Sequence, residues 1–443
     1  MTHFSTLAIH AGYDSADCTN GNAAVPPIYL SAAFDMQSAA HGDALSAGAA
    51  EGFSYSRVAN PTLDVLERRI AALEGGRSAV AFASGMAAVS AALLCAAEGG
   101  GRIIAARNLY GASVDAMDSL LPEFGIETDF VDDINDVRLV ESLIGPDTRA
   151  IFAESVANPS TEVADVAALA EIAHRHGVAL IVDNTVPTPY LFRPIELGGA
   201  DVVVHSTTKG ISGHGNALGG MVVDAGRFDW ATDRYPQFTR QEVVVSDDRN
   251  DDWHSFASKF GIDAYIRRVR IKYLRTFGAV ASPVNAYLQL LGVETLAVRL
   301  RQQVASATAI AEFLQTVPHV RAVHYSGLAL AGDGHAALQS ASQNELVRRD
   351  FPRGVGGMLS FEVDGGREQV ARILDGTHVF AYVPNIGDAR SLIVDPARIR
   401  HREVSPQFRR MSGVGDNLIR LSIGLEDTAD LIADLEQAIH GAY

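Results

Sequence analysis

Lys209 is the first candidate for chemistry because of its position in the sequence. It follows the apolar run 201–205, which predicts a β-strand, and the hydroxyl side chains of Ser206 and Thr208 precede it. An amine at the end of a strand suits a lysine that forms a Schiff base with an aldehyde. A single lysine after a strand is more often a solvated surface residue, so the interpretation depends on two other segments.

These segments supply a carboxylate and a site for an anion. The apolar run 178–183 predicts a buried strand that ends in Asp183, and the run 79–83 passes through Ser84 and Gly85 into an alanine-rich helix. The first amides of a helix bind anions, and open parallel sheets bind ligands at the carboxyl ends of their strands. An amine, a carboxylate and a phosphate site together match the aldehyde, ring nitrogen and phosphate of pyridoxal phosphate, which is therefore the predicted cofactor.

The chain resembles the Cys/Met-metabolism family of pyridoxal-phosphate enzymes over residues 5–425. This family includes cystathionine synthases and lyases, methionine γ-lyases and homoserine-ester sulfhydrylases, and the sequence is most similar to the O-acetylhomoserine sulfhydrylases. The resemblance implies an α/β protein with the fold of the type I transferases. Its large domain would contain a mostly parallel sheet, and a smaller α+β domain would form the carboxyl-terminal part.

The resemblance also assigns roles to side chains near the cofactor. It implies that Tyr55 and Arg57 reach from an extended arm to the phosphate in a neighbouring subunit, that Tyr110 stacks on the ring, and that Asn158 binds the phenolic oxygen. The catalytic residues would be Lys209, Tyr110 and Asp183. The expected cofactor site consists of Tyr55, Arg57, Ser84, Gly85, Met86, Tyr110, Asn158, Asp183, Thr185, Ser206, Thr208 and Lys209.

The carboxyl-terminal part supplies the expected substrate contacts. Arg420 lies between apolar neighbours, and a buried guanidinium requires an anion. The resemblance assigns the substrate carboxylate to Arg420 and to Asn385, with Tyr55 as a further substrate contact. Glu154 is expected to support the site or to be structural, and Ser360 to belong to a core strand.

The hydrophobic pattern predicts three parts: an extended arm over 1–60, a cofactor-binding domain over 61–281 and an α+β domain over 282–443. A polar insertion at 226–262 is expected at the surface. Strands are predicted at 79–83, 102–106, 126–131, 149–154, 178–183 and 201–205, and helices at 85–97, 113–122 and 163–176.

Composition narrows the function further. A formal net charge of −17 over 443 residues argues against nucleic acid or an anionic membrane as a partner. Cys18 and Cys95 allow at most one disulfide, and no run is long enough to span a membrane, so a reduced cytoplasmic protein is expected. His174 and His176 are interpreted as a solvated helix end and no metal is expected. The glycines at 99–101 do not form a dinucleotide fingerprint, which disfavours a nicotinamide dehydrogenase.

The predicted reaction is replacement at the γ-carbon of an O-acylhomoserine, most of all O-acetyl-L-homoserine, by sulfide or a thiol. The products would be acetate and homocysteine or methionine, and the resemblance implies a homotetramer. Alternatives are cystathionine γ-synthase or γ-lyase, methionine γ-lyase, an O-succinylhomoserine substrate, or a non-catalytic scaffold. Met86 and the altered segment 395–401 depart from the sulfhydrylase pattern, while Ala112 stands where methionine γ-lyases typically carry cysteine.

Overall fold

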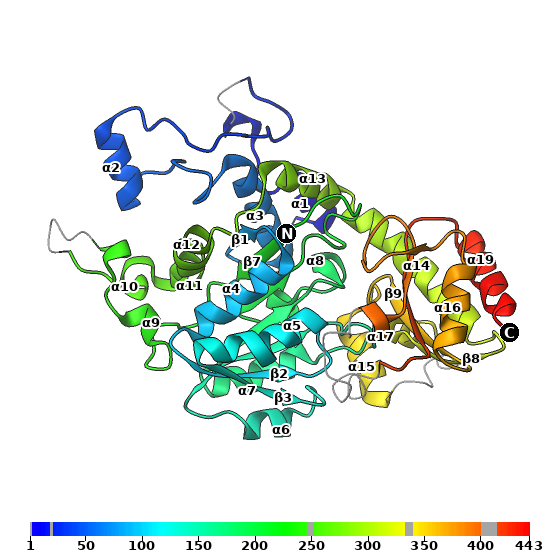
Figure 1. The fold of residues 1–443 in the computed structure, drawn as a ribbon. Helices are drawn as coiled ribbons and strands as arrows, with labels where there is room; N and C mark the ends of the chain where they lie inside the picture. Colours follow the sequence, from blue (N-terminus) through cyan, green and yellow to red (C-terminus); the bar gives the residue numbers. More distant parts are fainter. Residues whose placement is uncertain (1, 18–20, 247–251, 333–339, 400–413) are drawn as a thin grey trace.

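The computed structural model of the chain describes residues 2–17, 21–246, 252–332, 340–399 and 414–443. The described part contains a seven-stranded sheet in the order β1-β7-β6-β5-β4-β2-β3 and a five-stranded sheet in the order β10-β11-β12-β9-β8. Figure 1 shows the two sheets side by side with helices around each. The predicted α/β class, with a mostly parallel large sheet, is confirmed.

The strands of the large sheet follow the apolar runs of the sequence. Strands β2 to β6 run parallel, whereas β7 pairs antiparallel with both β1 and β6. The six predicted strands are present, but β7 was missed because a five-residue run behind two glycines is a weak signal. Their bounds are β1 (Ser78–Phe82), β2 (Gly101–Ala106), β3 (Ile126–Val131), β4 (Thr148–Glu154), β5 (Ala179–Asp183), β6 (Val202–His205) and β7 (Gly220–Asp224).

Helix α3 (Pro61–Glu74) illustrates how local sequence sets the element ends. The Asn60 side chain accepts a hydrogen bond from the Thr62 amide at 2.9 Å, and Gly75 ends the helix in the left-handed conformation with φ 75°. The apolar residues of its predicted inner face are buried, namely Leu63, Leu66, Ile70 and Leu73. This face anchors α3 against the large sheet.

Of the three other predicted helices, one matches its prediction, one has shifted ends and one is divided. Helix α4 (Gly85–Ala97) matches its prediction, and α7 (Val166–Arg175) begins three residues late because Asp165 caps it. The predicted helix 113–122 is divided into α5 (Gly111–Asp115), a π-helical turn (Ala116–Leu120) and a 3₁₀ turn (Leu121–Phe124).

The first sixty residues are less extended than expected. They contain α1 (Phe4–His10) and α2 (Ala39–Ala47), and Figure 1 shows α2 apart from the two sheets. Helix α1 packs against α3, and the Phe4 ring meets Tyr190 at 5.2 Å between centroids. Helices of seven and nine residues carry too short a periodic pattern to be recognised in the sequence.

The prediction of a polar surface insertion at 226–262 holds for Trp253, which is exposed, but was wrong for four other aromatic residues. Trp230, Tyr235, Phe238 and Phe256 are buried, and Trp230 stacks on Tyr265 at 4.4 Å between ring centroids. These rings belong to the same continuous core as the strands of the large sheet, because aromatic burial outweighs the polar average of the segment. The acidic stretch 247–251 lies outside the described residues, as does Cys18.

The second sheet follows two long helices. Helix α13 (Pro283–Glu294) packs against α3, and α14 (Leu296–Leu314) continues towards the second sheet. The predicted domain bounds at 60 and 281 stay a prediction. The other elements are β8 (Val320–His324), α15 (Ala341–Asp350), β9 (Met358–Val363), α16 (Arg367–Gly376), β10 (Ala381–Tyr382), β11 (Leu392–Val394), α17 (Pro396–Ile399), β12 (Leu418–Ser422) and α19 (Thr428–Gly441).

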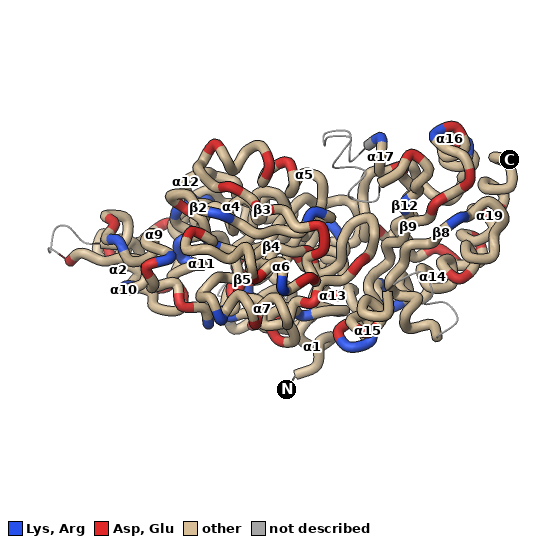
Figure 2. Tube along the Cα trace, turned by 90° about the horizontal axis from the view of Figure 1, so that it is seen from below, with Lys and Arg blue, Asp and Glu red and all other residues tan. Residues whose placement is uncertain are grey.

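Charged residues are spread over both parts of the molecule. Figure 2 shows acidic and basic positions interspersed along the chain. Among the described residues, no helix combines the length and apolar character needed to cross a membrane.

Asp224, at the end of β7, allows a test of how burial in the large sheet affects the stability of the protein. It is 1% exposed, and burial raises its pKa to about 7. Because the folded state holds the proton more tightly than the unfolded chain, ionisation destabilises the fold as the pH rises from about 4 through 7. We expect Asp224→Asn to stabilise the protein at pH 8, by the order of 1–4 kcal/mol, and to have little effect at pH 4.

Thermal unfolding at both pH values measures this difference. The exposed Glu171→Gln provides the matched control, with no pH-dependent gain. An equal effect of Asp224→Asn on stability at both pH values would contradict a raised pKa of Asp224 in the folded protein.

Candidate active site

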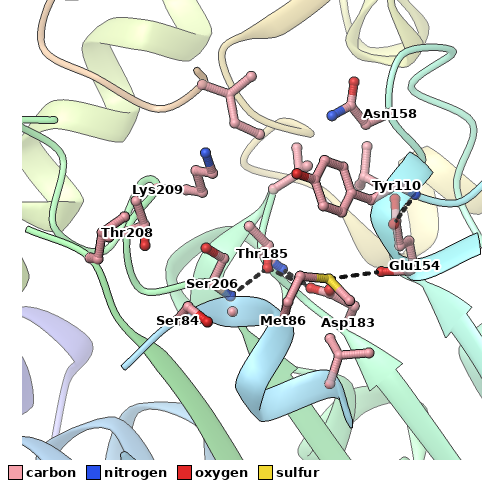
Figure 3. Close-up of a pocket in the computed structure, with 17 residues that line it drawn as sticks. Ser84, Met86, Tyr110, Glu154, Asn158, Asp183, Thr185, Ser206, Thr208 and Lys209 are labelled. Atoms are coloured by element: carbon pink, nitrogen blue, oxygen red, sulfur yellow. Dashed lines mark hydrogen bonds between the residues drawn. The ribbon is translucent and has the colours of Figure 1, made fainter. Parts of the chain in front are cut away.

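A pocket opens at the carboxyl ends of β4, β5 and β6, facing the start of α4 (Figure 3). Parallel strands end at the same edge of a sheet, so residues distant in sequence meet there. The pocket is lined by Ser84, Gly85, Met86, Val89, Tyr110, Ser113, Glu154, Val156, Asn158, Asp183, Thr185, Val186, Ser206, Thr208, Lys209, Leu218 and Ile386.

The start of α4 forms the anion-binding side of the pocket. Ser84 caps the helix by accepting a hydrogen bond from the Ala87 amide at 3.2 Å. The first amides of a helix have no acceptor within it, so those of Gly85 and Met86 suit a bound anion. Gly85 lies so close to Ser206 that a Cβ atom would be 2.6 Å from the serine Cβ. This position therefore requires glycine.

Asp183 ends β5 and provides the carboxylate of the pocket. Its Oδ1 accepts hydrogen bonds from the amide of Thr185 at 2.9 Å and from its hydroxyl at 2.5 Å. Burial raises the pKa of Asp183, although the hydrogen bonds from Thr185 and the charge of His205 lower it. A cationic partner would stabilise the ionised form of this carboxyl.

The loop after β6 presents the amine. Ser206 donates its amide to Thr185 Oγ1 at 2.8 Å, and Thr208 donates its hydroxyl to the carbonyl of Gly219 at 3.1 Å. Lys209 follows, and its Nζ donates to Asn385 Oδ1 at 2.6 Å. The loop thus holds two hydroxyl groups near the start of α4 and connects the amine to the carboxyl-terminal part.

Tyr110 forms another wall of the pocket. Its amide donates to Glu154 Oε1 at 2.6 Å, and Figure 3 shows its hydroxyl pointing towards the side of the pocket where Lys209 lies. Glu154 itself lines the pocket. Glu154 was expected only to support the site or to be structural, and its place in the pocket lining fits a supporting role.

Arg420 and Asn385 approach the pocket from the second sheet. Arg420, which is 2% exposed, donates through Nη1 to Asn158 Oδ1 at 3.2 Å and through Nη2 to the carbonyl of Asn385 at 3.0 Å. A hydrogen-bonded chain therefore runs from Lys209 through Asn385 and Arg420 to Asn158. Ser360, opposite Arg420 in the sheet, is buried and bonds the carbonyl of Pro159, as expected of a core strand residue.

Tyr55 and Arg57 lie elsewhere in this chain. Tyr55 is 44% exposed, and the Arg57 guanidinium lies 5.3 Å from its ring centroid while donating to the carbonyl of Arg275 at 2.7 Å. Neither side chain is among those that line the pocket. A role at the cofactor site would accordingly require a second subunit.

The sequence also did not identify several apolar residues of the pocket. They are Val89, Val156, Val186, Leu218 and Ile386. Such side chains carry no chemical signal, and only the fold brings them to the site. Ser113 was missed as well, although its buried hydroxyl lies 3.8 Å from Met86 Sδ.

His174 and His176, which were interpreted as a solvated helix end, each contact a carboxylate. His174 Nε2 lies 2.9 Å from Asp201 Oδ2, and its hydrogen bond to Asp201 raises the pKa of His174. His176 Nε2 lies 2.9 Å from Glu141 Oε1. Within the described ranges, no group of three or more His, Cys, Asp or Glu side chains is arranged to hold a metal ion.

The pocket fits pyridoxal phosphate on three counts. Ser84 and Gly85 start a helix suited to a phosphate, Asp183 is a carboxyl that a cation would stabilise, and Lys209 provides an amine. A family model of Cys/Met metabolism PLP-dependent enzymes matches residues 5–440. The chain belongs to this family.

Relatives and a solved structure agree with this assignment. An O-acetyl-L-homoserine sulfhydrylase of Leptospira meyeri is 37% identical, over 98% of this chain and 96% of the relative. An L-methionine γ-lyase of Pseudomonas putida is 38% identical, over 98% of this chain and 97% of the relative. The chain also matches a solved Campylobacter jejuni structure described as an O-acetylhomoserine (thiol)-lyase, with TM-score 0.91, 36% identity and coverage of 99% of this chain and 100% of the other. That structure carries a pyridoxyl-lysine phosphate at its position 205.

Asp183→Asn tests the carboxylate of the pocket. We expect the variant to fold but to bind pyridoxal phosphate at least about 10-fold more weakly and to lose most turnover, because a charge-assisted hydrogen bond worth about 1.5–3 kcal/mol is lost. Absorbance titration of the apoprotein measures the affinity. Asp118→Asn, at an exposed position, serves as the control, and wild-type affinity in Asp183→Asn would make this residue structural.

Proposed function

We propose that the protein catalyses γ-replacement on an O-acylhomoserine, most of all O-acetyl-L-homoserine, with sulfide or a thiol. The products are acetate and homocysteine, or methionine where the thiol is methanethiol. The observation that carries this proposal is the chain of hydrogen bonds from Lys209 through Asn385 to Arg420, because it connects a proton-transferring amine to a cation suited to an amino-acid carboxylate. The names of the sulfhydrylase relatives support the reaction type.

Four groups of residues would hold the cofactor. The start of α4, together with Ser206 and Thr208, would bind the phosphate of the cofactor, and Asp183 would bind its ring nitrogen. Tyr110 would stack on the face of the ring, and Lys209 would bond to the aldehyde carbon. Bound there, pyridoxal phosphate supplies an electron sink that makes the protons next to the substrate amine acidic. The anionic Asp183 keeps the ring nitrogen protonated and so strengthens this sink.

Lys209 performs the proton transfers. Its amine takes the proton from the substrate Cα and, once it has handed that proton on, takes one from Cβ, after which the ester oxygen leaves Cγ as acetate. Sulfide or a thiol then adds at Cγ, and the protons return to Cβ and Cα. Asn385 Oδ1 accepts a hydrogen bond from this amine at 2.6 Å, so it lies beside the position from which the amine acts once the substrate has released it.

Arg420 sets the orientation of the substrate. Its guanidinium binds a carboxylate bidentately, and its contacts with Asn158 and Asn385 hold it in place. A substrate fixed by its carboxylate presents the Cα proton in one direction only. Apolar residues, among them Val156, Val186 and Ile386, exclude water from the carbon chain of the ester.

Methionine γ-lyase chemistry is the second candidate. The Pseudomonas putida lyase is as similar to this chain as the sulfhydrylases are, so overall identity does not separate the two reactions. Ala112, in place of the cysteine typical of those lyases, and the Asn385-Ile386-Gly387-Asp388 segment favour the sulfhydrylase. Met86, which lines the pocket, leaves the succinyl ester as an alternative substrate.

The segment 395–401 also bears on which substrate the protein accepts. Asp395 accepts a hydrogen bond from the Tyr382 hydroxyl at 2.9 Å and pairs with Arg398 at 3.2 Å, while Arg400 and His401 lie outside the described residues. Charged groups at this position would change the route by which the substrate enters.

We also propose that the active unit is a homotetramer whose sites are shared between subunits. The first sixty residues would extend to a neighbouring chain, where Tyr55 and Arg57 contact the cofactor phosphate and Tyr55 the substrate. The exposure of Tyr55 and its position outside this chain's own pocket support the proposal.

Product analysis tests the reaction. The purified holoenzyme is incubated with O-acetyl- or O-succinyl-L-homoserine plus sulfide, and separately with L-methionine or cystathionine, and products are identified by mass spectrometry. We expect homocysteine from the acetyl ester at a kcat/KM at least about 10-fold above that for the other substrates, a difference of about 1.4 kcal/mol. Faster consumption of methionine or cystathionine would assign the protein to the lyase or synthase reaction instead.

Subunit complementation tests the shared site. Arg57→Ala and Lys209→Ala chains, each inactive alone, should regain about a quarter of wild-type activity after mixing at equal amounts. The reason is that half of the dimers are hybrid and each hybrid contains one intact site. Mixing Asp183→Ala with Lys209→Ala is the control, because both changes lie in the same pocket and no site is restored. Confirmed subunit exchange without recovery would contradict the proposal.

A further inference from the structure

Glu154 occupies a position beside Asp183 that the proposed reaction does not use. It ends β4, Asp183 ends β5, and the two residues are paired in register on neighbouring parallel strands. Residues paired in this way point to the same face of a sheet, and both side chains line the cofactor pocket. The structure thus places two carboxyl groups where the ring nitrogen needs only one.

Glu154 makes a specific contact with another residue of the pocket. Its Oε1 accepts the amide of Tyr110 at 2.6 Å, and this residue immediately precedes α5 (Figure 3). The contact fixes the backbone from which the tyrosine ring extends into the pocket. Either a carboxylate or a neutral carboxyl accepts this hydrogen bond.

The surroundings of Glu154 disfavour a second negative charge. Glu154 is 9% exposed, and burial, together with the charge of Asp183, raises its pKa well above the ordinary value, although the amides of Tyr110 and Asn158 lower it. Lys209 is the basic residue on the pocket side. On the other side Glu154 borders a second cavity, whose charged lining residues are Asp132, Asp133, Glu162, Asp165, Glu345 and Arg349. Acidic groups outnumber the basic one there, so ionisation of Glu154 would add to an existing excess of negative charge.

We propose that Glu154 is a positioning residue of the cofactor site, which as a neutral carboxyl holds the Tyr110 backbone and leaves Asp183 the single anion facing the ring nitrogen. The division of roles has a physical reason: two adjacent buried carboxylates cannot both ionise at low cost, and the one paired with a cation keeps the charge. The inference concerns the cofactor site and holds whichever amino acid is the substrate.

Two substitutions separate the roles of the hydrogen bond and the charge. Glu154→Gln keeps an acceptor for the Tyr110 amide and imitates the neutral acid, whereas Glu154→Leu removes the acceptor. Glu162→Gln is the matched control, because Glu162 lines the second cavity and bonds Asn108 and Ser160 rather than Tyr110. Each variant is studied as the holoenzyme, with pyridoxal phosphate as the probe.

Circular dichroism of the bound cofactor reports the position of the Tyr110 ring. We expect Glu154→Gln to retain the visible band of wild type and Glu154→Leu to lose at least about half of its amplitude, with Glu162→Gln unchanged. Loss of the band in Glu154→Gln to the same extent as in Glu154→Leu would overturn the proposal, because the negative charge would then be essential. Retention of the full band in Glu154→Leu would overturn the positioning role.

Infrared spectroscopy reports the protonation state directly and does not depend on Glu154→Leu folding. The difference spectrum of wild type minus Glu154→Gln at pH 7 should contain the carbonyl stretch of a protonated carboxyl, with the shift in D₂O that marks an exchangeable proton. A carboxylate band in its place would show Glu154 ionised and would overturn the proposal. A structural contact alone does not determine which band appears.

Discussion

The parallel pairing of β4, β5 and β6 is the constraint on which the site depends. Because these strands run in one direction, their carboxyl ends meet at one edge of the sheet, and the start of α4 faces that edge. Glu154 and Asp183 lie 29 residues apart in sequence and Asp183 and Lys209 lie 26 apart, and they become neighbours only through this pairing. The anion site, the carboxylate and the amine are therefore three consequences of one topology.

The second sheet contributes to the site through a close contact between one of its loops and the loop that carries Lys209. Gly387, with φ 71°, lies so near the lysine loop that a Cβ atom would be 2.5 Å from the amide of Gly210. Glycine thus permits the loop 383–391 to reach Lys209 and to place Asn385 between the amine and Arg420. A larger residue at 387 would separate the two loops and break this chain of contacts.

Arg420 gains polar partners by the same arrangement, and these partners offset the cost of burying its charge.

Much of this arrangement could be predicted from the sequence, and the failures have physical causes. Long apolar runs ending in Asp183 or leading to Lys209 have strong signals, so the six predicted strands are present and many of the expected site residues line one pocket. Strand β7, the short helices α1 and α2 and the buried rings around Trp230 were not, because short elements and tertiary burial leave weak local patterns. The contact between Lys209 and Asn385 joins residues 176 positions apart, a distance over which no periodicity gives information. The roles assigned to Tyr55 and Arg57 depend on a second chain, which one sequence does not describe.

On the opposite face, buried polar contacts hold the same strand ends. Asp183 pairs with Val204, so the next residues, Asn184 and His205, point to the other face of the sheet. There His205 Nε2 lies 2.6 Å from Glu74 Oε1, and Asn184 donates to the same oxygen at 2.9 Å. All three side chains are fully buried, where an unpaired polar group would be costly and a paired one has little freedom to move. Glu74, the last residue of α3, thereby contacts the ends of both β5 and β6. Burial raises the pKa of Asp183, and the charge of His205 offsets part of this rise. One face of these strands holds the reactive groups, and on the other face Glu74 joins the ends of the same two strands to α3.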